Sequence, residues 1–253
     1  MARFDMSDSE WSVVQPLLPT KVRGVSRVDD RRVINGILWR WRTGAPWEDI
    51  PERYGSHKPC YNRFVRRRRA GVWDRILKAV SDAYDGDIQM IDSSLIRVHQ
   101  NGANGDKSEG GSGCMGRSRG GLTSKIHAVV DAFGLPIGLS LSEGQAYNGH
   151  QAAPLQSNLP ENAIVLADRA YDADIIRDLI TSQQAFPNIP QRRRCPPFSK
   201  YLYKMRNLIE RFFNKIKHFR AIATRYEKDP RDYMAGVKLA SARTWIRFNE
   251  STT

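Results

Sequence analysis

The chain has 253 residues, with 40 Lys and Arg against 27 Asp and Glu, a formal net charge of +13 and a pI of about 9.9. This length gives ample core for one large domain or two smaller ones, and the positive excess indicates a polyanionic partner such as nucleic acid. Three widely spaced cysteines without a CxxC pair argue against a zinc site or a disulfide framework, and no apolar run reaches the roughly 20 residues that cross a bilayer. We therefore expect a cytoplasmic, nucleoid-associated protein.

The positive charge is concentrated in two segments. Residues 21–80 carry 16 Lys and Arg against 6 Asp and Glu, and residues 191–228 carry 12 against 2, so each segment has a net charge of +10. The rest of the chain is then net −7. Two basic segments around a mildly acidic middle suit a nucleic acid gripped on both sides of a metal site, although a generally basic protein would give the same totals.

The first 85 residues predict short helices joined by tight turns. Apolar spacing and helix-end residues predict helices near 5–18, 29–43, 46–55, 57–69 and 72–84. The helix near 57–69 is expected to place Tyr61, Phe64 and Val65 inward and its arginines largely outward: Arg63, Arg66, Arg67, Arg68 and Arg69. This pattern indicates a helix-turn-helix-like DNA-binding module in residues 1–85. A solvated helix face is the alternative interpretation of the arginine run.

Residues 86–253 alternate between strand and helix patterns. We expect strands at 87–94, 122–134, 135–144, 163–167 and 185–189, and helices at 150–159, 171–183, 203–217 and 232–247. A glycine-rich loop separates the first two strands. Asp92 lies at or near the end of the first strand, and Asp168 follows the fourth. The predicted fold class is α/β, with a mixed five-stranded sheet and helices on both faces.

The helix over 203–217 is strongly two-sided. At about 100° per residue its apolar side chains fall in one arc: Met205, Leu208, Ile209, Phe212 and Ile216. The other side carries Tyr203, Arg206, Glu210 and Lys217 within roughly 60°. A solvated face with favourable charge pairs would explain this arrangement equally well.

The spacing Tyr203-x2-Arg206-x3-Glu210-x6-Lys217 resembles the signature of the DDE transposases of bacterial insertion sequences. The words NLIERFFNKIKHFRAIATRYEK and TGAPWEDIPERYG resemble the IS-five group of that family, and GRSRGG is also typical of it. The likeness runs from about residue 5 to 248. It implies a ribonuclease-H-like catalytic domain over 86–253, preceded by the helical module.

The resemblance also implies the site residues. Asp92 in MIDSS, Asp168 in LADRAYD and Glu210 match the three metal-binding carboxylates of the family. Three oxygen ligands suit Mg²⁺ or Mn²⁺. By itself, an aspartate after a strand is more often a cap or turn residue. The predicted DNA contacts are Tyr203, Arg206, Lys217, Arg63, Arg66, Arg67, Arg117 and Arg119.

The predicted function is DNA transposition. A transposase would bind the terminal inverted repeats of its element as a homodimer or higher oligomer, cleave the phosphodiester at the ends and join the 3′-hydroxyls to target DNA by two-metal-ion chemistry. A ribonuclease-H-like nuclease is one alternative, although it gives no reason for Tyr203, Arg206 and Lys217. A non-catalytic DNA-binding repressor is the other.

Overall fold

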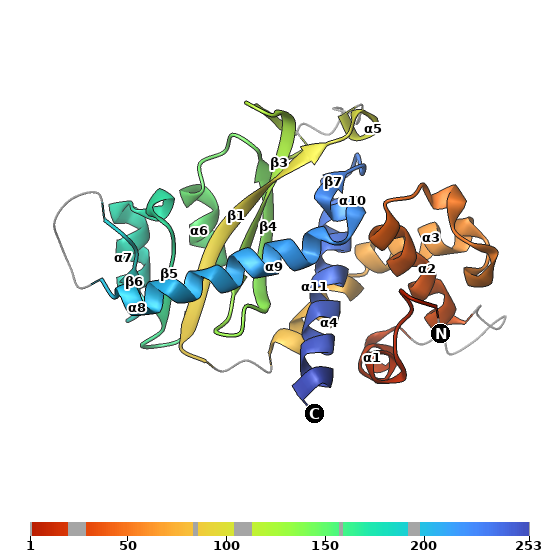
Figure 1. Ribbon diagram of the computed structural model, residues 1–253, viewed down its shortest axis with the longest axis horizontal. Coiled ribbons are helices and arrows are strands. Elements are labelled where there is room, and N and C mark those ends of the chain that lie inside the picture. The colour runs from red at the N-terminus through yellow and green to blue at the C-terminus, as the bar shows by residue number, and fades with distance from the viewer. Residues whose placement is uncertain are drawn as a thin grey trace.

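The computed structural model describes residues 2–19, 29–82, 86–103, 113–156, 159–191 and 198–252. A twisted sheet flanked by helices forms one side of the molecule, and a group of helices formed mainly by the N-terminal segment lies on the other (Figure 1). Among the described residues, none of the helices has the length and apolar character that would span a membrane.

Several of the N-terminal helices begin or end at residues that the sequence predicts. Ser7 closes a capping box with Glu10, Asp29 caps the second helix, and Gly44 ends that helix in the left-handed region at φ 74°. Residues 46–55 form two 3-10 turns instead of the single short helix expected. The elements are α1 (Asp8–Val14), η1 (Gln15–Leu17), α2 (Asp30–Thr43), η2 (Trp47–Asp49), η3 (Glu52–Tyr54), α3 (His57–Arg69) and α4 (Val72–Ser81).

The sheet is built around one long strand, β1. It pairs antiparallel with β3 on one side and parallel with β5 on the other, and the main order is β4-β3-β1-β5-β6. The strands are β1 (Ile88–Val98), β2 (Gly116–Ser118), β3 (Gly121–Val130), β4 (Pro136–Glu143), β5 (Ile164–Leu166), β6 (Phe186–Asn188) and β7 (Thr224–Arg225). This topology is ribonuclease-H-like, so the predicted fold class is confirmed; the short β2 and β7 are two strands more than the five expected.

Helices cover both faces of the sheet. One face carries α9 (Asn207–Lys217) and α11 (Pro230–Thr252), and α6 (Gly149–Leu155) and α7 (Asp174–Ser182) cover the other. Along β1 the side chains alternate between these layers: Met90 packs with the α9 side and Ile91 with the α7 side. Short helical pieces complete the fold: α5 (Gln100–Ala103), η4 (Arg169–Tyr171), α8 (Lys200–Tyr203), η5 (Lys204–Arg206) and α10 (Arg220–Ala223).

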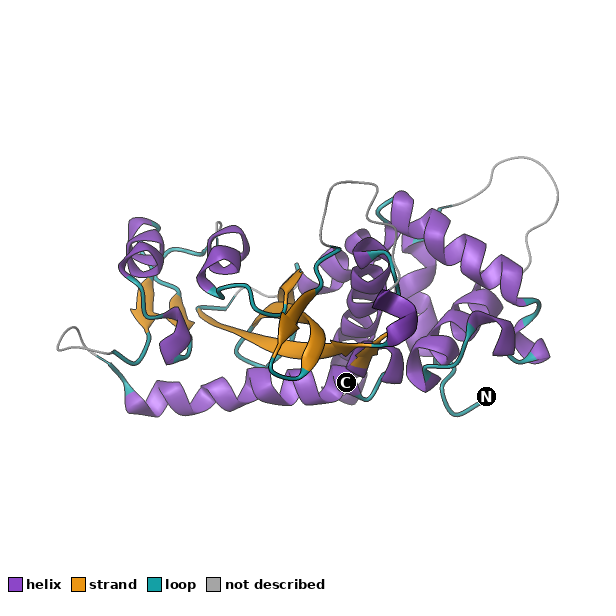
Figure 2. Cartoon of the chain, turned by 90° about the horizontal axis from the view of Figure 1, so that it is seen from above, coloured by secondary structure: helices purple, strands orange, loops and turns teal. Residues whose placement is uncertain are grey.

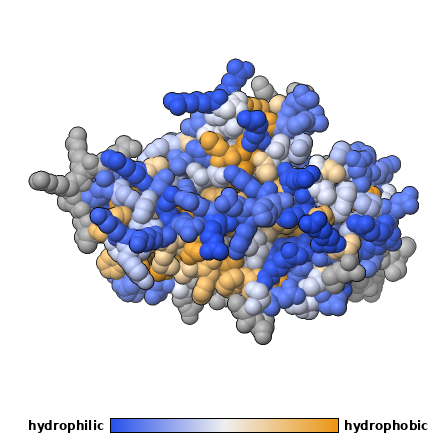
Figure 3. Space-filling model, in the orientation of Figure 1, coloured by the Kyte–Doolittle hydropathy of each residue, from blue (hydrophilic) through white to orange (hydrophobic). Residues whose placement is uncertain are grey.

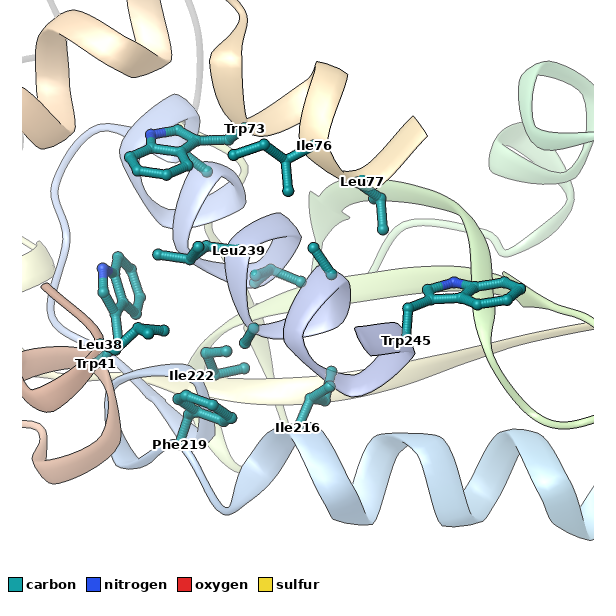
Figure 4. Packing of buried hydrophobic residues seen from close by; sticks show 14 of the residues in the cluster. Leu38, Trp41, Trp73, Ile76, Leu77, Ile216, Phe219, Ile222, Leu239 and Trp245 are labelled. Carbon is teal, nitrogen blue, oxygen red and sulfur yellow. The ribbon is translucent and has the colours of Figure 1, made fainter. Parts of the chain in front are cut away.

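The core on the α9 side is continuous with the core of the N-terminal helices. Trp41 from α2, Trp73 from α4 and Trp245 from α11 belong to one buried cluster (Figure 4). Trp41 lies so close to Gly236 of α11 that a Cβ at that glycine would be 2.1 Å from the ring. The boundary at residues 85 and 86 stays a prediction, and the helices on its two sides share their apolar packing.

Candidate active site

The strand register brings Asp92 and Asp168 together. Met90 of β1 is the parallel partner of Leu166 of β5, and the two aspartates each lie two residues further along their segments. Adjacent strands are about 4.8 Å apart, so two side chains at the same level on one face are neighbours. Asp168 caps the following turn, because its Oδ1 accepts from the Ala170 N–H at 2.9 Å.

Asp92 lies inside β1, which continues for six residues to Val98. The expectation that Asp92 ends its strand is therefore wrong: β1 keeps pairing with β3 as far as Arg97. The Asp92 side chain is only 14% exposed. This burial raises its pKa, as does the charge of Asp168, while the Ser93 N–H and the Arg206 guanidinium favour the charged carboxylate.

Arg206 bridges two of the three predicted metal ligands. Its Nη1 donates to Asp92 Oδ2 at 2.6 Å, and its Nη2 donates to Glu210 Oε1 at 2.8 Å. The guanidinium also lies over the Tyr203 ring, 5.8 Å from the centroid. The motif that the sequence singles out therefore gathers around Asp92, with Arg206 at its centre.

The helical run from α8 to α9 buries the face that the apolar spacing predicts. Ile209, Phe212 and Ile216 are fully buried, and Met205 and Leu208 pack against the core. Glu210 points the other way and its side chain is 55% exposed. The helix thus buries its apolar face, as predicted, and its Arg206 contacts Asp92 on the central strand β1.

Two residues near the carboxylates were not predicted from the sequence. Ser94 accepts a hydrogen bond from Lys217 Nζ at 2.6 Å, which ties the last residue of the motif to β1. Its position two residues after Asp92 in an alternating strand is the signal that could have found it. Tyr171 is fully buried, and its hydroxyl has no hydrogen-bond partner among the described residues. Burial, then the charge of Asp92, raises the pKa of this phenol.

The predicted donor set fits a hard divalent cation in its chemistry, because all three predicted ligands are carboxylates. In the described part of the chain, however, no three His, Cys, Asp or Glu side chains stand close enough together to hold a metal ion. The guanidinium of Arg206 forms salt bridges with both Asp92 and Glu210, at 2.6 and 2.8 Å. Its positive charge compensates the carboxylates in the form described here.

The arginines of α3 do not all face solvent. Arg67 is 5% exposed and, with Arg63, pairs with Asp30 of α2 at 2.7 and 2.5 Å. Arg68 pairs with Asp232 at 2.7 Å. The run was predicted to point largely outward, and Arg67 does not, since α3 packs between α2 and α11. Arg66 is exposed.

Near the glycine loop, Arg117 in β2 and Arg119 in the following turn are exposed, as their predicted DNA contact requires. Lys125 is instead held inside the fold, donating to Ala146 O at 2.7 Å and Asn148 Oδ1 at 2.9 Å. Asp131 is buried in the β3–β4 turn, and its side chain accepts hydrogen bonds from backbone N–H groups there.

Two family models match the chain. Residues 83–244 match the model described as "Transposase DDE domain", and residues 6–77 match "Putative transposase of IS4/5 family". The chain is 44% identical over 130 residues to a "Putative transposase for insertion sequence element IS6501" from Brucella ovis, covering 50% of this chain and 100% of that protein. It is 33% identical over 112 residues to an uncharacterised protein of insertion element IS402 from Burkholderia cepacia, covering 39% of this chain and 76% of that protein.

Among solved structures, the chain resembles a pre-cleavage Mos1 transpososome at 13% identity and a TM-score of 0.28, covering 91% of this chain and 82% of that chain. That likeness is too weak to bear on the site. The sequence matches suffice: the chain belongs to the DDE transposases of insertion sequences, in the IS4/5 group. The resemblance stated from the sequence is confirmed, and with it an enzyme of DNA cleavage and strand transfer that uses divalent metal ions.

Proposed function

We propose that this transposase binds the terminal inverted repeats of its own insertion sequence, cleaves the phosphodiester at each end and joins the 3′-hydroxyls to target DNA. Asp92, Asp168 and Glu210 are the proposed metal ligands. The observation that carries the proposal is the register of β1 and β5, which sets Asp92 and Asp168 side by side below the helix that carries Glu210. We expect the assembled form to be a homodimer or higher oligomer on paired ends, in the cytoplasm and associated with the nucleoid.

A pair of Mg²⁺ or Mn²⁺ ions at these carboxylates would supply activation of the attacking oxygen and stabilisation of the leaving oxygen. The chain's own part is to hold Asp92 and Asp168 on rigid elements and to exclude water around them. Arg206 must first release at least one of its two carboxylates. Its guanidinium is then free to bind a phosphate beside the scissile bond in a forked contact.

The remaining cations have proposed roles in holding DNA. Lys217, anchored on Ser94, offers a point charge close to Asp92, and Tyr203 offers a ring and a hydroxyl. Arg117 and Arg119 project from the β2 edge, and residues 1–85 form the proposed DNA-binding module. Within that module, Arg66 is exposed and Arg63 and Arg67 already pair with Asp30, so we expect Arg66 to contribute more to DNA binding than the other two.

The experiment is cleavage of end DNA in Mg²⁺ by Asp92→Asn, Asp168→Asn and Glu210→Gln variants. Each is expected to lose cleavage by at least about 10³-fold while binding the same DNA. Asp178→Asn is the matched control, because Asp178 is an exposed carboxylate on α7, ten residues after Asp168. Cleavage that persists in one variant removes that residue from the site.

Measurement of metal binding distinguishes the proposed role of Arg206 from that of the proposed metal ligands. Titration of Mn²⁺, followed by calorimetry or by the electron paramagnetic resonance of the free ion, should show weaker binding in the carboxylate variants. In Arg206→Ala, Mn²⁺ binding should be unchanged or tighter, because the competing guanidinium is gone, while end cleavage falls. If Arg206→Ala cleaves end DNA like wild type, the Tyr203/Arg206/Glu210/Lys217 face is merely a solvated helix face.

The nuclease alternative predicts cleavage of RNA–DNA hybrids without joining of 3′-ends. The repressor alternative predicts equal binding of end DNA with a chelator present and no cleavage at all. Joining of a labelled element end to a plasmid, lost in Asp92→Asn, contradicts both.

A further inference from the structure

A line of positive and amide side chains follows the outer surface of α8, η5 and α9. We name it the cationic ridge, and it consists of exposed residues spaced over five turns: Lys200, Lys204, Asn207, Arg211, Asn214, Lys215 and His218. In Figure 2 this helical run forms a rod along one side of the molecule, with no other helix on its outer surface. Figure 3 shows hydrophilic side chains as a band across the face where α9 lies.

The ridge is distinct from the catalytic face of the same helix. At about 100° per residue, Lys204, Arg211 and Lys215 centre roughly 140° away from the direction of Arg206, Glu210 and Lys217. The buried face occupies the third side. The proposed active site therefore does not use these cations, and packing does not require them.

The ridge lacks acids. From residue 199 to 226 the chain has eight Lys and Arg and one acid, Glu210, which is paired with Arg206. None of Lys200, Lys204, Arg211 and Lys215 forms a salt bridge with any residue that the structure describes. An ordinary solvated helix mixes both signs, as α4 does where Lys78 pairs with Asp82.

The positive surface continues beyond the end of α9. Phe219, which follows the ridge, lies under the guanidinium of Arg42 from α2, with 5.3 Å between the guanidinium carbon and the ring centroid. Burial, and then the charges of Arg247, Arg243 and Arg3, lower the pKa of Arg42. Arg243 and Arg247 are themselves paired with Glu10, so Arg42 is the residue that extends the positive surface at this end of the rod.

We infer that the cationic ridge is a second DNA-binding surface, which holds the phosphate backbone of duplex DNA along α8–α9 without reading its sequence. The inference rests on the proposed function in that the DNA held here is a substrate of the same enzyme. From Lys200 to His218 the run spans about 27 Å at 1.5 Å per residue. One strand places about eight phosphates along such a length. Lysine, arginine and asparagine side chains donate hydrogen bonds to phosphate oxygens. Such contacts carry no sequence information unless the helix enters a groove and reaches the base edges.

The test uses the full chain and a duplex of random sequence that lacks the element ends. Affinity is measured by fluorescence anisotropy against KCl concentration for wild type, Arg211→Gln/Lys215→Gln and Lys200→Gln/Lys204→Gln. Each pair is expected to flatten the slope of log K against log salt by about 2 and to weaken binding several-fold at low salt. Arg75→Gln/Lys78→Gln is the matched control, since it removes the same charge from the exposed face of α4.

Two further measurements decide the outcome. Arg211→Lys/Lys215→Arg keeps the charge and should keep the wild-type slope, which excludes a loss caused by misfolding. Mg²⁺-dependent nicking at a pre-bound element end should persist in Arg211→Gln/Lys215→Gln, while joining to target DNA falls by about tenfold or more. An unchanged slope in both ridge pairs overturns the inference and leaves the carboxylate site untouched. A change of oligomeric state without a change of slope assigns the ridge to a second copy of the chain and also overturns it.

Discussion

Two helices of this protein look alike in sequence and use their charges in opposite ways. The helix α3 ends in four consecutive arginines, and α8–α9 carries regularly spaced lysines and arginines. On α3, Arg63 and Arg67 pair with Asp30, and Arg68 pairs with Asp229 and Asp232. On the cationic ridge no cation is paired with any described residue. A count of positive charge therefore does not say how much of it is available to DNA.

The physical difference is what covers each helix. The helix α3 lies between α2 and α11, and the acids that meet its arginines come from positions 33 to 164 residues away. The outer side of α8–α9 faces no other element (Figure 2). Arginine that is desolvated beside a neighbouring helix needs an acid, whereas arginine in water does not. The comparison predicts that the paired arginines of α3, Arg63, Arg67 and Arg68, chiefly stabilise the fold and that the ridge cations chiefly bind DNA.

The largest effect on stability should come from Arg67→Ala. This change removes a buried ion pair with Asp30 and the contact of the guanidinium with the Trp73 ring, at a cost of about 2–3 kcal/mol in the free energy of unfolding. Arg66→Ala, one residue earlier and exposed, should change that energy by no more than about 0.5 kcal/mol. Urea denaturation of both variants measures the difference. Equal stabilities would mean that burial does not distinguish the two arginines.

Within α3, the exposed arginines should contribute more to DNA binding than the paired ones, the reverse of their order for stability. Replacing the exposed Arg66 and Arg69 by glutamine should flatten the salt dependence of binding by about 1 to 2, because each can neutralise one phosphate. Replacing Arg63 and Arg68 should leave the slope within about 0.5 of wild type, since both are engaged with aspartates. Anisotropy titrations from 50 to 300 mM KCl give the slopes. A flatter slope for the Arg63 and Arg68 pair would show that DNA displaces those aspartates.

The sequence predicted the elements that place the site better than it predicted the contacts within it. Motif spacing located Asp92, Asp168 and Glu210, and helical periodicity predicted the buried face of α9; their roles as metal ligands stay a prediction. The end of β1 was predicted too early, because alternation fades at Ser93 and Ser94 while pairing with β3 continues to Arg97. Local patterns cannot report a partner strand that comes later in the chain.

Contacts between residues distant in sequence account for the rest. Arg206 and Asp92 are 114 residues apart, and Lys217 and Ser94 are 123 apart. Periodicity gives the direction in which Arg206 points from its helix but not what it meets there. Tyr171 was missed for another reason. It follows Asp168 by three residues, where the sequence predicts only an aromatic residue in a turn, and its burial near Asp92 is known from the structure alone.

Arg68 of α3 pairs with two acids, Asp229 and Asp232. Asp229 and Asp232 both lie at the N-terminal end of α11, but their environments differ. Burial raises the pKa of Asp232 to about 6, with help from Asp229 and Glu227 and against the pull of Arg68 and Arg231. The pKa of Asp229 is lowered: burial works against this shift, but the hydrogen bonds of Arg231 outweigh it. Ionisation of Asp232 therefore lowers the stability of the fold, whereas ionisation of Asp229 raises it.

The smallest predicted effect is on the pH dependence of the free energy of unfolding, part of which Asp232→Asn should remove. In the unfolded chain Asp232 titrates near 3.8, and in the fold near 6, so the folded state binds the proton more tightly. Its contribution to stability is complete below pH about 4 and is lost as pH rises through about 6. Between pH 5 and 7 the wild type should lose about 1 kcal/mol more than Asp232→Asn in the free energy of unfolding, measured by urea denaturation at each pH. Asp229→Asn should show the opposite sign, with its loss of stability growing as pH rises through the range where Asp229 ionises. Parallel pH profiles for wild type and Asp232→Asn would mean that Arg68 holds Asp232 charged throughout, and that the α3 interface is a fully ionic one.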